Sequence, residues 1–229
     1  MLIKSFPAGP WQTNCYVVAP SRNSECFIVD PGYQSADAIA SIVQAENLKP
    51  IAVLVTHGHL DHMWSLFPAA RGYDIPAVVH AQDRHLLSDP LSGISNETIL
   101  MLRDTLNESE PFVEPDEIVE ISDNTSLDVA GLTLKITHAP GHTAGSVLFE
   151  IDDDEPTVFT GDVLFAGAIG RTDLPGGSSQ AMTETLRNHI LPISDSATIL
   201  PGHGPRTTMA VERVTNQYLL RVAQGLNAV

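Results

Sequence analysis

The sequence predicts an α/β fold in which two mixed β-sheets pack face to face, with helices on their outer surfaces. Two observations support this prediction. Strand-like segments alternate with segments of helical periodicity in the first half of the chain, and strand-like segments dominate the second half until helical segments close it. The chain has 229 residues, of which 43% are hydrophobic, and this is enough for one large core. We therefore expect a single domain over residues 1–229.

The first half of the chain predicts a hairpin followed by alternating helices and strands. Its expected strands are short runs of β-branched and aromatic residues, and its expected helices carry apolar residues at helical spacing. The strands are predicted over 14–18, 26–29, 51–55 and 77–79. The helices are predicted over 35–48, 63–70 and 81–88. Pro50 is expected to end the first of these helices.

The segment 89–116 interrupts this alternation. It carries several prolines and a glycine around a helical stretch over 97–106, which is typical of an excursion that covers a functional site. Beyond it, strands are predicted over 118–121, 132–137, 146–151, 157–159 and 198–200, and helices over 180–189 and 209–224. Gly131 and the acidic segment 152–154 are expected where the chain reverses between strands.

The charge and composition exclude several classes of partner. A net charge of -16 repels polyanions, so nucleic acid and anionic lipid are disfavoured. No apolar run reaches the length of a membrane span, and the first residues lack the apolar core of a signal peptide. We expect a cytoplasmic protein that acts on a small molecule. Cys15 and Cys26 lie in apolar segments and are expected to be buried free thiols.

Metal-competent side chains are concentrated in the stretch VTHGHLDHM at residues 55–63. His57 and His59 stand two apart at the end of a predicted strand, so both imidazoles leave on one side and can share one ion. Asp61 and His62 follow where the chain begins to turn, which suits a second, adjacent ion.

Three later residues occupy the same kind of position. His142, Asp162 and His203 each follow a predicted strand and lie beside glycine, where backbone segments can approach closely. Histidine with carboxylate is a donor set that suits zinc, manganese or iron rather than calcium. Two divalent ions with two carboxylates and a bridging hydroxide would leave the centre slightly positive, so that shared water ionises near neutral pH.

The segment His57–His62 is identified as the HxHxDH signature of the metallo-β-lactamase superfamily. The resemblance extends over residues 57–203 and implies the αββα sandwich, which agrees with the order of elements above. It implies two divalent metal ions, one held by His57, His59 and His142 and the other by Asp61, His62 and His203, with Asp162 bridging. Zinc is expected, with iron or manganese as alternatives.

Within this superfamily the segments 139–146, 160–165 and 170–173 resemble the glyoxalase II-like hydrolases. Their chemistry is hydrolysis of a hydroxyacyl thioester, such as S-lactoylglutathione, to a hydroxy acid and a free thiol. The resemblance implies attack by the bridging hydroxide, with Asp162 holding both ions and Asp61 able to receive the proton. The thiolate leaves readily because its pKa is low.

Three departures set this chain apart from glyoxalase II. Met63-Trp64-Ser65 replaces two small positions after the signature, so Trp64 either reshapes the wall of the site or packs beneath it. Only 26 residues follow His203, whereas glyoxalase II has a helical domain there that grips glutathione. The segment Pro201–Pro205 resembles compact relatives instead.

Alternatives to the thioesterase remain open. A persulfide dioxygenase-like enzyme shares most of these motifs but uses one iron, and hydrolases of a lactone, a β-lactam or another small ester also fit. The net charge argues against a nuclease of the RNase Z type. A binding module with a vestigial site would have lost a ligand, and here none is lost.

Other polar residues have less specific interpretations. Arg171 either reaches a substrate carboxylate or pairs with Asp173. Asp30 either hydrogen-bonds a ligand histidine or caps a turn. The remaining histidines are not expected to bind the ions, although one of them, His138, could orient a neighbouring ligand. These are His80, His85, His138 and His189.

Overall fold

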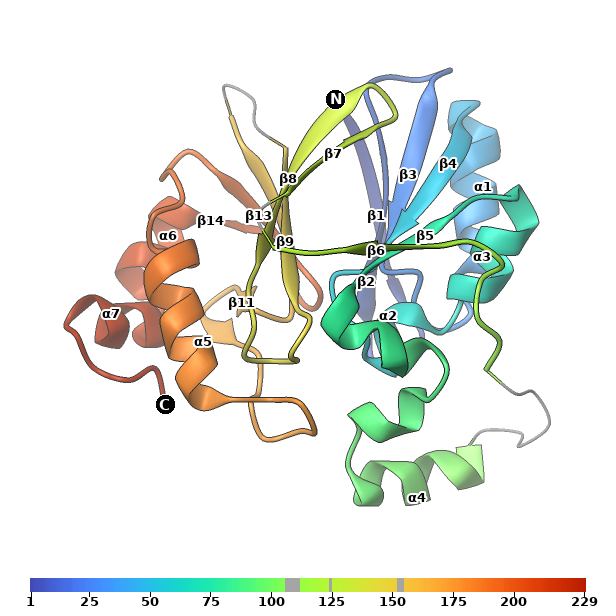
Figure 1. Ribbon diagram of the computed structural model, residues 1–229. Coiled ribbons are helices and arrows are strands. Elements are labelled where there is room, and N and C mark those ends of the chain that lie inside the picture. Colours follow the sequence, from blue (N-terminus) through green and yellow to red (C-terminus); the bar gives the residue numbers. More distant parts are fainter. Residues whose placement is uncertain (106–111, 124, 152–154) are drawn as a thin grey trace.

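The computed structural model describes residues 1–105, 112–123, 125–151 and 155–229, and its two main β-sheets face each other between outer layers of helices (Figure 1). The first sheet has the order β1 (Leu2–Ala8), β2 (Thr13–Ala19), β3 (Glu25–Val29), β4 (Lys49–Leu54), β5 (Ala77–His80) and β6 (Ile118–Ile121). The second has the order β14 (Thr207–Thr208), β13 (Thr198–Pro201), β10 (Thr157–Gly161), β9 (Val147–Ile151), β8 (Leu132–His138) and β7 (Thr125–Val129). A small hairpin joins β11 (Leu164–Phe165) and β12 (Ala168–Ile169).

Both sheets are mixed, as the sequence predicts. In the first sheet β1, β2 and β3 pair antiparallel, whereas β3 to β6 run parallel. In the second sheet β10 and β13 run parallel and the other pairs are antiparallel. Parallel strands end at the same edge of a sheet, so the loops that follow β3 and β4, and those that follow β10 and β13, gather at shared edges.

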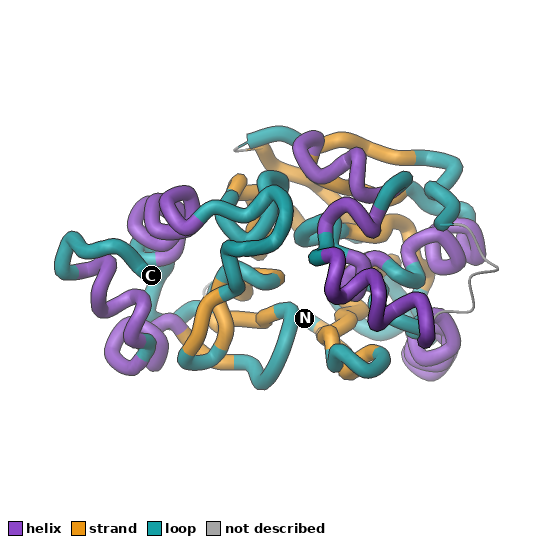
Figure 2. Tube along the Cα trace, turned by 90° about the horizontal axis from the view of Figure 1, so that it is seen from below, coloured by secondary structure: helices purple, strands orange, loops and turns teal. Residues whose placement is uncertain are grey.

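Helices cover the outer face of each sheet. The first sheet is covered by α1 (Ala36–Glu46) and α3 (Leu66–Tyr73), and the second by α5 (Ser179–Thr185), α6 (Met209–Thr215) and α7 (Gln217–Ala223), as both views show (Figures 1 and 2). The core is layered accordingly. Between the sheets lie fully buried side chains such as Phe27, Phe149 and Phe159. Separate apolar layers pack beneath the helices on each side, and the predicted αββα class is confirmed.

Two predicted helices are interrupted. The helix predicted over 63–70 is split into α2 (Leu60–Met63) and α3, because the backbone N–H of Ser65 donates to Pro31 and its hydroxyl accepts from the N–H of Ser35. The helix predicted over 209–224 is split into α6 and α7 at Asn216, whose side chain caps α7. Polar side chains that bond to nearby backbone compete with helix continuation.

Several boundaries also differ from the predictions. Pro50 lies inside β4, and the preceding helix ends at Asn47, which adopts a left-handed conformation. The segment 81–87 is a 3-10 helix, η1, rather than an α-helix. Strands β1, β7, β11, β12 and β14 were not predicted. Gly131 lies at the β7–β8 reversal with φ +74°, as expected, whereas the segment 152–154 lies outside the described residues.

The excursion after residue 89 contains the 3-10 helix η2 (Pro90–Gly93) and α4 (Asn96–Thr105), which lies below the first sheet in Figure 1. Part of the predicted helix and of the excursion, residues 106–111, lies outside the described residues. Gly93 packs close to the ring of His59, since an added Cβ there would lie 3.3 Å from its Cδ2. Among the described helices, none is long and apolar enough to cross a membrane.

Candidate metal centre

All seven side chains singled out by the sequence meet at one edge of the two sheets. Four come from the segment after β4, which turns into α2. The other three come from the loops after β8, β10 and β13 of the facing sheet. The residues are His57, His59, Asp61 and His62 from the first sheet, and His142, Asp162 and His203 from the second. The sequence therefore identified a group that the fold brings together.

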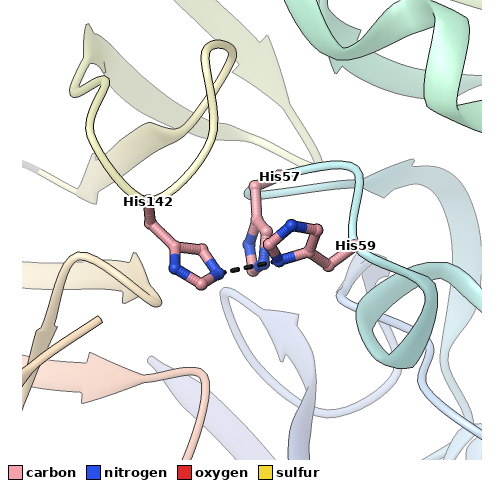
Figure 3. Close-up of side chains that lie close together, drawn as sticks. All are labelled: His57, His59 and His142. Atoms are coloured by element: carbon pink, nitrogen blue, oxygen red, sulfur yellow. Dashed lines mark hydrogen bonds between the residues drawn. The ribbon is translucent and has the colours of Figure 1, made fainter. Parts of the chain in front are cut away.

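His57, His59 and His142 form the first group of candidate ligands (Figure 3). Nδ1 of His59 lies 2.8 Å from Nε2 of His142, and the side-chain nitrogens of all three residues come within 4.8 Å of one another. The three residues are between 1% and 3% exposed. Water therefore has little access to these nitrogens, which favours a bound cation as their partner.

Asp61, His62 and His203 form the second group. Nε2 of His203 lies 3.1 Å from Oδ2 of Asp61 and 3.3 Å from Nε2 of His62. Asp162 lies between the two groups. Its Oδ1 is 3.3 Å from Nε2 of His62, and its Oδ2 is 3.5 Å from Nε2 of both His142 and His203. A carboxylate in this position can contact an ion in either group.

In three of the histidines, Nδ1 points away from the centre and has a hydrogen-bond partner, which shows that Nε2 faces the centre. Nδ1 of His142 donates to the carbonyl of Arg171 at 2.8 Å, and Nδ1 of His203 donates to the carbonyl of Trp11 at 3.0 Å. A carbonyl can only accept, so in the neutral imidazole Nε2 keeps its lone pair and points inward. Nδ1 of His62 likewise donates to Oδ2 of Asp30 at 2.9 Å. Metal-binding histidines typically have this arrangement.

Buried atoms without hydrogen bonds support the same interpretation. Thr56 donates its hydroxyl to Asp30, so its oxygen is free to accept from Nδ1 of His57 at 3.1 Å. Nε2 of His57 and Oδ1 of Asp162 are then buried acceptors without a hydrogen-bond donor among the described residues, and Nε2 of His59 also has no partner there. Buried acceptors that converge without donors are costly unless a cation binds them. The residues therefore fit a pair of metal ions.

The pKa shifts of the centre follow from burial and mutual charge. Burial, followed by the neighbouring histidines, holds the pKa of His57 well below its usual value, and burial and His142 lower that of His59 to about 3. Burial also opposes a charge on His62, but Asp162, Asp61 and Asp30 outweigh it and raise its pKa. His57 and His59 thus present neutral nitrogens, whereas His62 attracts a positive charge.

Asp30 is one of two buried carboxylates that hold this centre in place. Besides accepting from His62, it accepts from the backbone N–H of Thr56 at 2.8 Å and from its hydroxyl at 2.7 Å. It is 1% exposed. Of the two interpretations from the sequence, contact with a candidate ligand is the one observed, and the residue fixes both the ring of His62 and the strand end before His57.

Asp83 is the second such carboxylate, and it was not predicted. Its oxygens accept from the N–H of Gly58 at 2.8 Å, the N–H of Gly145 at 2.6 Å and the hydroxyl of Thr143 at 2.6 Å. It is 1% exposed and lies in η1. Because Gly58 separates His57 from His59 and Thr143 follows His142, Asp83 joins both loops of the first group. The hydroxyl of Thr13 was missed as well and donates to Oδ2 of Asp61 at 2.9 Å.

Gly202 allows the His203 loop to approach the centre. A Cβ at this position would lie 2.6 Å from Cε1 of His62 and would overlap Oδ1 of Asp162. No larger residue fits there unless these side chains move, which explains the glycine next to this predicted ligand.

The two residues predicted to contact substrate have different surroundings. Arg171 pairs with Asp173 through two hydrogen bonds of 2.7 and 2.8 Å, which is one of the two interpretations that the sequence offered. Its contact with the centre is made by its backbone carbonyl, which accepts from His142. Trp64 belongs to a half-buried aromatic group beside the centre, with Tyr33 at 4.6 Å, Phe112 at 5.5 Å and Trp11 at 6.3 Å between ring centroids. A role of either residue in substrate binding remains a prediction.

The four remaining histidines lie outside the two groups, as expected. His85 is exposed, and Nε2 of His138 donates to the carbonyl of Ala144 at 2.8 Å. His138 thus braces the loop that carries His142, which is the supporting role considered for it.

A sequence model of the Metallo-beta-lactamase superfamily matches residues 8–203, a range that includes all seven residues of the centre. The chain belongs to that superfamily. Together with the fold and the two His/Asp groups, this membership makes the protein a metal-dependent enzyme of the metallo-hydrolase class.

Several members of the metallo-beta-lactamase superfamily are similar to this chain along nearly their whole length. Hydroxyacylglutathione hydrolase GloC of Haemophilus influenzae is 31% identical over 220 residues, which cover 96% of this chain and 98% of that protein. The crystal structure of BLEG-1 B3 metallo-beta-lactamase is 33% identical with a TM-score of 0.81, covering 95% and 99% of the two chains. TTHA1623, solved in a di-iron-bound form, is 30% identical with a TM-score of 0.77, covering 94% and 99%.

Proposed function

We propose that this protein is a dinuclear metal-dependent thioesterase that hydrolyses a hydroxyacyl thioester to a hydroxy acid and a free thiol. The observation that carries the proposal is the convergence of inward-facing ring nitrogens and two carboxylates on two adjacent groups, with Asp162 between them. The donor set suits two divalent ions, zinc foremost. The di-iron form of TTHA1623 keeps iron as an alternative.

His57, His59 and His142 would hold one ion and Asp61, His62 and His203 the other, with Asp162 shared. Two ions so bound supply Lewis acidity toward a carbonyl and ionise a shared water near neutral pH. Asp61 accepts from Thr13, which fixes the orientation of its carboxylate. This leaves Asp61 oriented to take up a proton at the second group. A thiolate is a good leaving group, so the chain needs no strong acid beside the scissile bond.

The surroundings of the centre supply an apolar wall. Trp64 follows His62 by two positions and contacts Tyr33 and Phe112, so its ring extends apolar surface next to the second group. Such a surface suits the carbon chain of an acyl group or thiol carrier. We propose that Trp64 lines the acyl side of the substrate site, where two small residues stand in glyoxalase II.

The similarity to GloC supports a thioester substrate, since that protein is a hydroxyacylglutathione hydrolase. The BLEG-1 structure, which is similar to an equal degree, makes a β-lactam the second substrate to test. A persulfide dioxygenase-like iron enzyme is the third candidate, because its motifs overlap with those of the chain. The three differ in metal content and in the product released.

The first experiment combines elemental analysis of the purified protein with thiol release from S-lactoylglutathione. About two ions per chain together with thiol release would support the proposal. One iron per chain, no thiol release and oxygen consumption with a persulfide would overturn it in favour of sulfur oxidation. Hydrolysis of a β-lactam without thiol release would reassign the substrate.

Two variants make the assay specific. Asp162→Asn removes the carboxylate charge between the groups and is expected to abolish thiol release together with at least one ion. Asp173→Asn changes an exposed carboxylate whose salt-bridge partner is Arg171, so it controls for loss of charge near the site. Equal loss in both variants would contradict the assignment of Asp162.

A further inference from the structure

A second histidine–aspartate cluster lies outside the centre, between the two sheets. His80 ends β5, Asp123 follows β6 and His138 ends β8. Oδ1 of Asp123 is 3.1 Å from Nε2 of His80 and 3.1 Å from Nδ1 of His138. The two imidazoles stack with ring centroids 4.2 Å apart and planes inclined by 12°. Three candidate ligand atoms thus lie within 4.8 Å of one another.

The hydrogen bonds around the cluster leave two acceptors facing each other. Nε2 of His138 donates to the carbonyl of Ala144 at 2.8 Å, so a neutral His138 has its proton on Nε2 and a lone pair on Nδ1. That lone pair faces Oδ1 of Asp123, which is also an acceptor. Such a pair repels unless a positive charge lies between the atoms. His138 also has the tautomer of a metal-binding histidine, with its outer N–H bonded to a carbonyl.

His80 stabilises the carboxylate in this arrangement. Its Nδ1 accepts from the backbone N–H of Gln82 at 3.3 Å, so Nε2 carries the proton and donates to Asp123. His80 is 3% exposed, and burial lowers its pKa. The hydrogen bond from His80 in turn lowers the pKa of Asp123. Asp123 is therefore an anion at neutral pH while His80 remains neutral.

A pocket opens beside the cluster and offers further donors. It has a volume of about 190 Å³ and is lined by Asp123 and His138 together with Glu184, His189 and Asn188. Burial lowers the pKa of His189, which leaves a neutral nitrogen at neutral pH. The pocket thus combines two imidazoles and two carboxylates, and it has room for water to complete a coordination shell.

We propose that His138 and Asp123 form a second metal site that binds a divalent transition-metal ion of the zinc type at the mouth of this pocket. Nδ1 of His138 and the carboxylate of Asp123 are its ligands, and His80 orients the carboxylate. Water in the pocket completes the shell. The imidazole nitrogens favour zinc over magnesium or calcium, which prefer oxygen ligands alone.

This site would connect the two sheets at a distance from the catalytic centre. Asp123 follows the first sheet and His138 belongs to the second, so one ion would join them. His138 also braces the loop that carries His142 through the carbonyl of Ala144. The proposal does not depend on the reaction of the main centre, because it concerns a separate set of ligands.

Zinc stoichiometry tests the proposal. The full-length protein and its variants are dialysed against buffered Zn²⁺, and bound zinc per chain is measured by elemental analysis. Asp123→Asn and His138→Gln are each expected to bind one zinc fewer than the unchanged protein. The matched controls Asp128→Asn and His85→Gln alter exposed residues outside the cluster and are expected to keep the full number. Because Asp123 contacts His80 and His138 and none of the seven residues of the main centre in the described structure, a deficit of one zinc in Asp123→Asn reports on this site whatever number of ions the main centre binds.

Equal zinc binding by the unchanged protein and Asp123→Asn would overturn the proposal. Nitrogen NMR of the His138 ring provides a second measurement, which remains valid if His138→Gln folds poorly. Zinc is expected to shift the Nδ1 resonance of His138 while Nε2 stays protonated. A ring that stays doubly protonated in the presence of zinc would show that a proton alone neutralises the cluster, and would refute the site.

Discussion

Asp83 provides the sharpest test of how the first ligand group is held. Its carboxylate joins Gly58, between His57 and His59, to the loop after His142. Replacing Asp83 with alanine leaves two buried backbone N–H groups without acceptors, and each such group costs about 1–3 kcal/mol, so we expect a loss of about 4 kcal/mol. The hydroxyl of Thr143 adds little to this figure because it retains Ser146 at 2.8 Å.

Asp83→Asn is the milder change and the better probe. Its amide oxygen can replace one carboxylate oxygen, but its NH₂ group then faces a backbone N–H, so we expect a loss of about 2 kcal/mol. For a chain of this size that lowers Tm by about 4–8 °C. Weakened support of metal ligands typically reduces metal affinity about 10–100-fold, and the ion at His57, His59 and His142 should show this.

Thermal unfolding and competition with a metal chelator measure both effects. Asp116→Asn is the matched control, because it removes the charge of an exposed aspartate instead. If Asp83→Asn retains the Tm and the metal affinity of the unchanged protein, the proposed clamp between the two loops is wrong. A loss of stability at unchanged metal affinity would limit Asp83 to a structural role.

Three further predictions concern the rest of the centre. Asp162→Ala should bind at most one ion and lose thiol release, and full turnover with two bound ions would rule out a shared carboxylate. Asp30→Ala removes the acceptor of His62, so metal affinity should fall about 10–100-fold in chelator competition, and an unchanged affinity would argue against this support. Metal-free protein should lose Tm as pH rises above about 6.5, where His57 and His59 are already neutral in the folded and unfolded chains and His62 loses its proton. The folded pKa of His62 is raised, by carboxylates that outweigh burial, so its stabilisation is complete below the unfolded pKa of about 6.5 and is lost as pH passes the folded value. A metal-free Tm that is constant with pH would contradict this.

The buried strands of the two main sheets were predictable from the sequence, and of the four strands at the sheet edges only β6 was predicted. Segments such as β3 and β10 are almost entirely buried, so their apolar runs are continuous. The missed strands β1, β7 and β14 each lie at an edge of one of the two main sheets, where most side chains are exposed or only partly buried and the apolar pattern is weak. The helix interruption at Ser65 depends on hydrogen bonds to Pro31 and Ser35, and the one at Asn216 on its side-chain cap of α7; hydrophobic periodicity reports neither.

The candidate ligands were predictable because each follows a strand and lies in a recognisable motif. Their supports were harder to find. Asp30 was considered since it directly follows a strand, whereas Asp83 lies within η1 and has no partner nearby in sequence. Its bonds to Gly58 and Gly145 span 25 and 62 positions. Thr13 and Asp61 are likewise 48 positions apart, so only the folded chain brings these pairs together.

The division of the centre between the two sheets has a kinetic consequence. Neither half of the chain carries all the donors for either ion, because His142 and His203 come from loops of the second sheet while their partners follow the first. Ions bound as proposed would therefore be held fully only after the sheets have docked, and they would stabilise that state alone. Contacts that form after the transition state for folding slow unfolding without accelerating folding. Bound metal then extends the lifetime of the native protein against proteolysis and heat, beyond its part in the reaction.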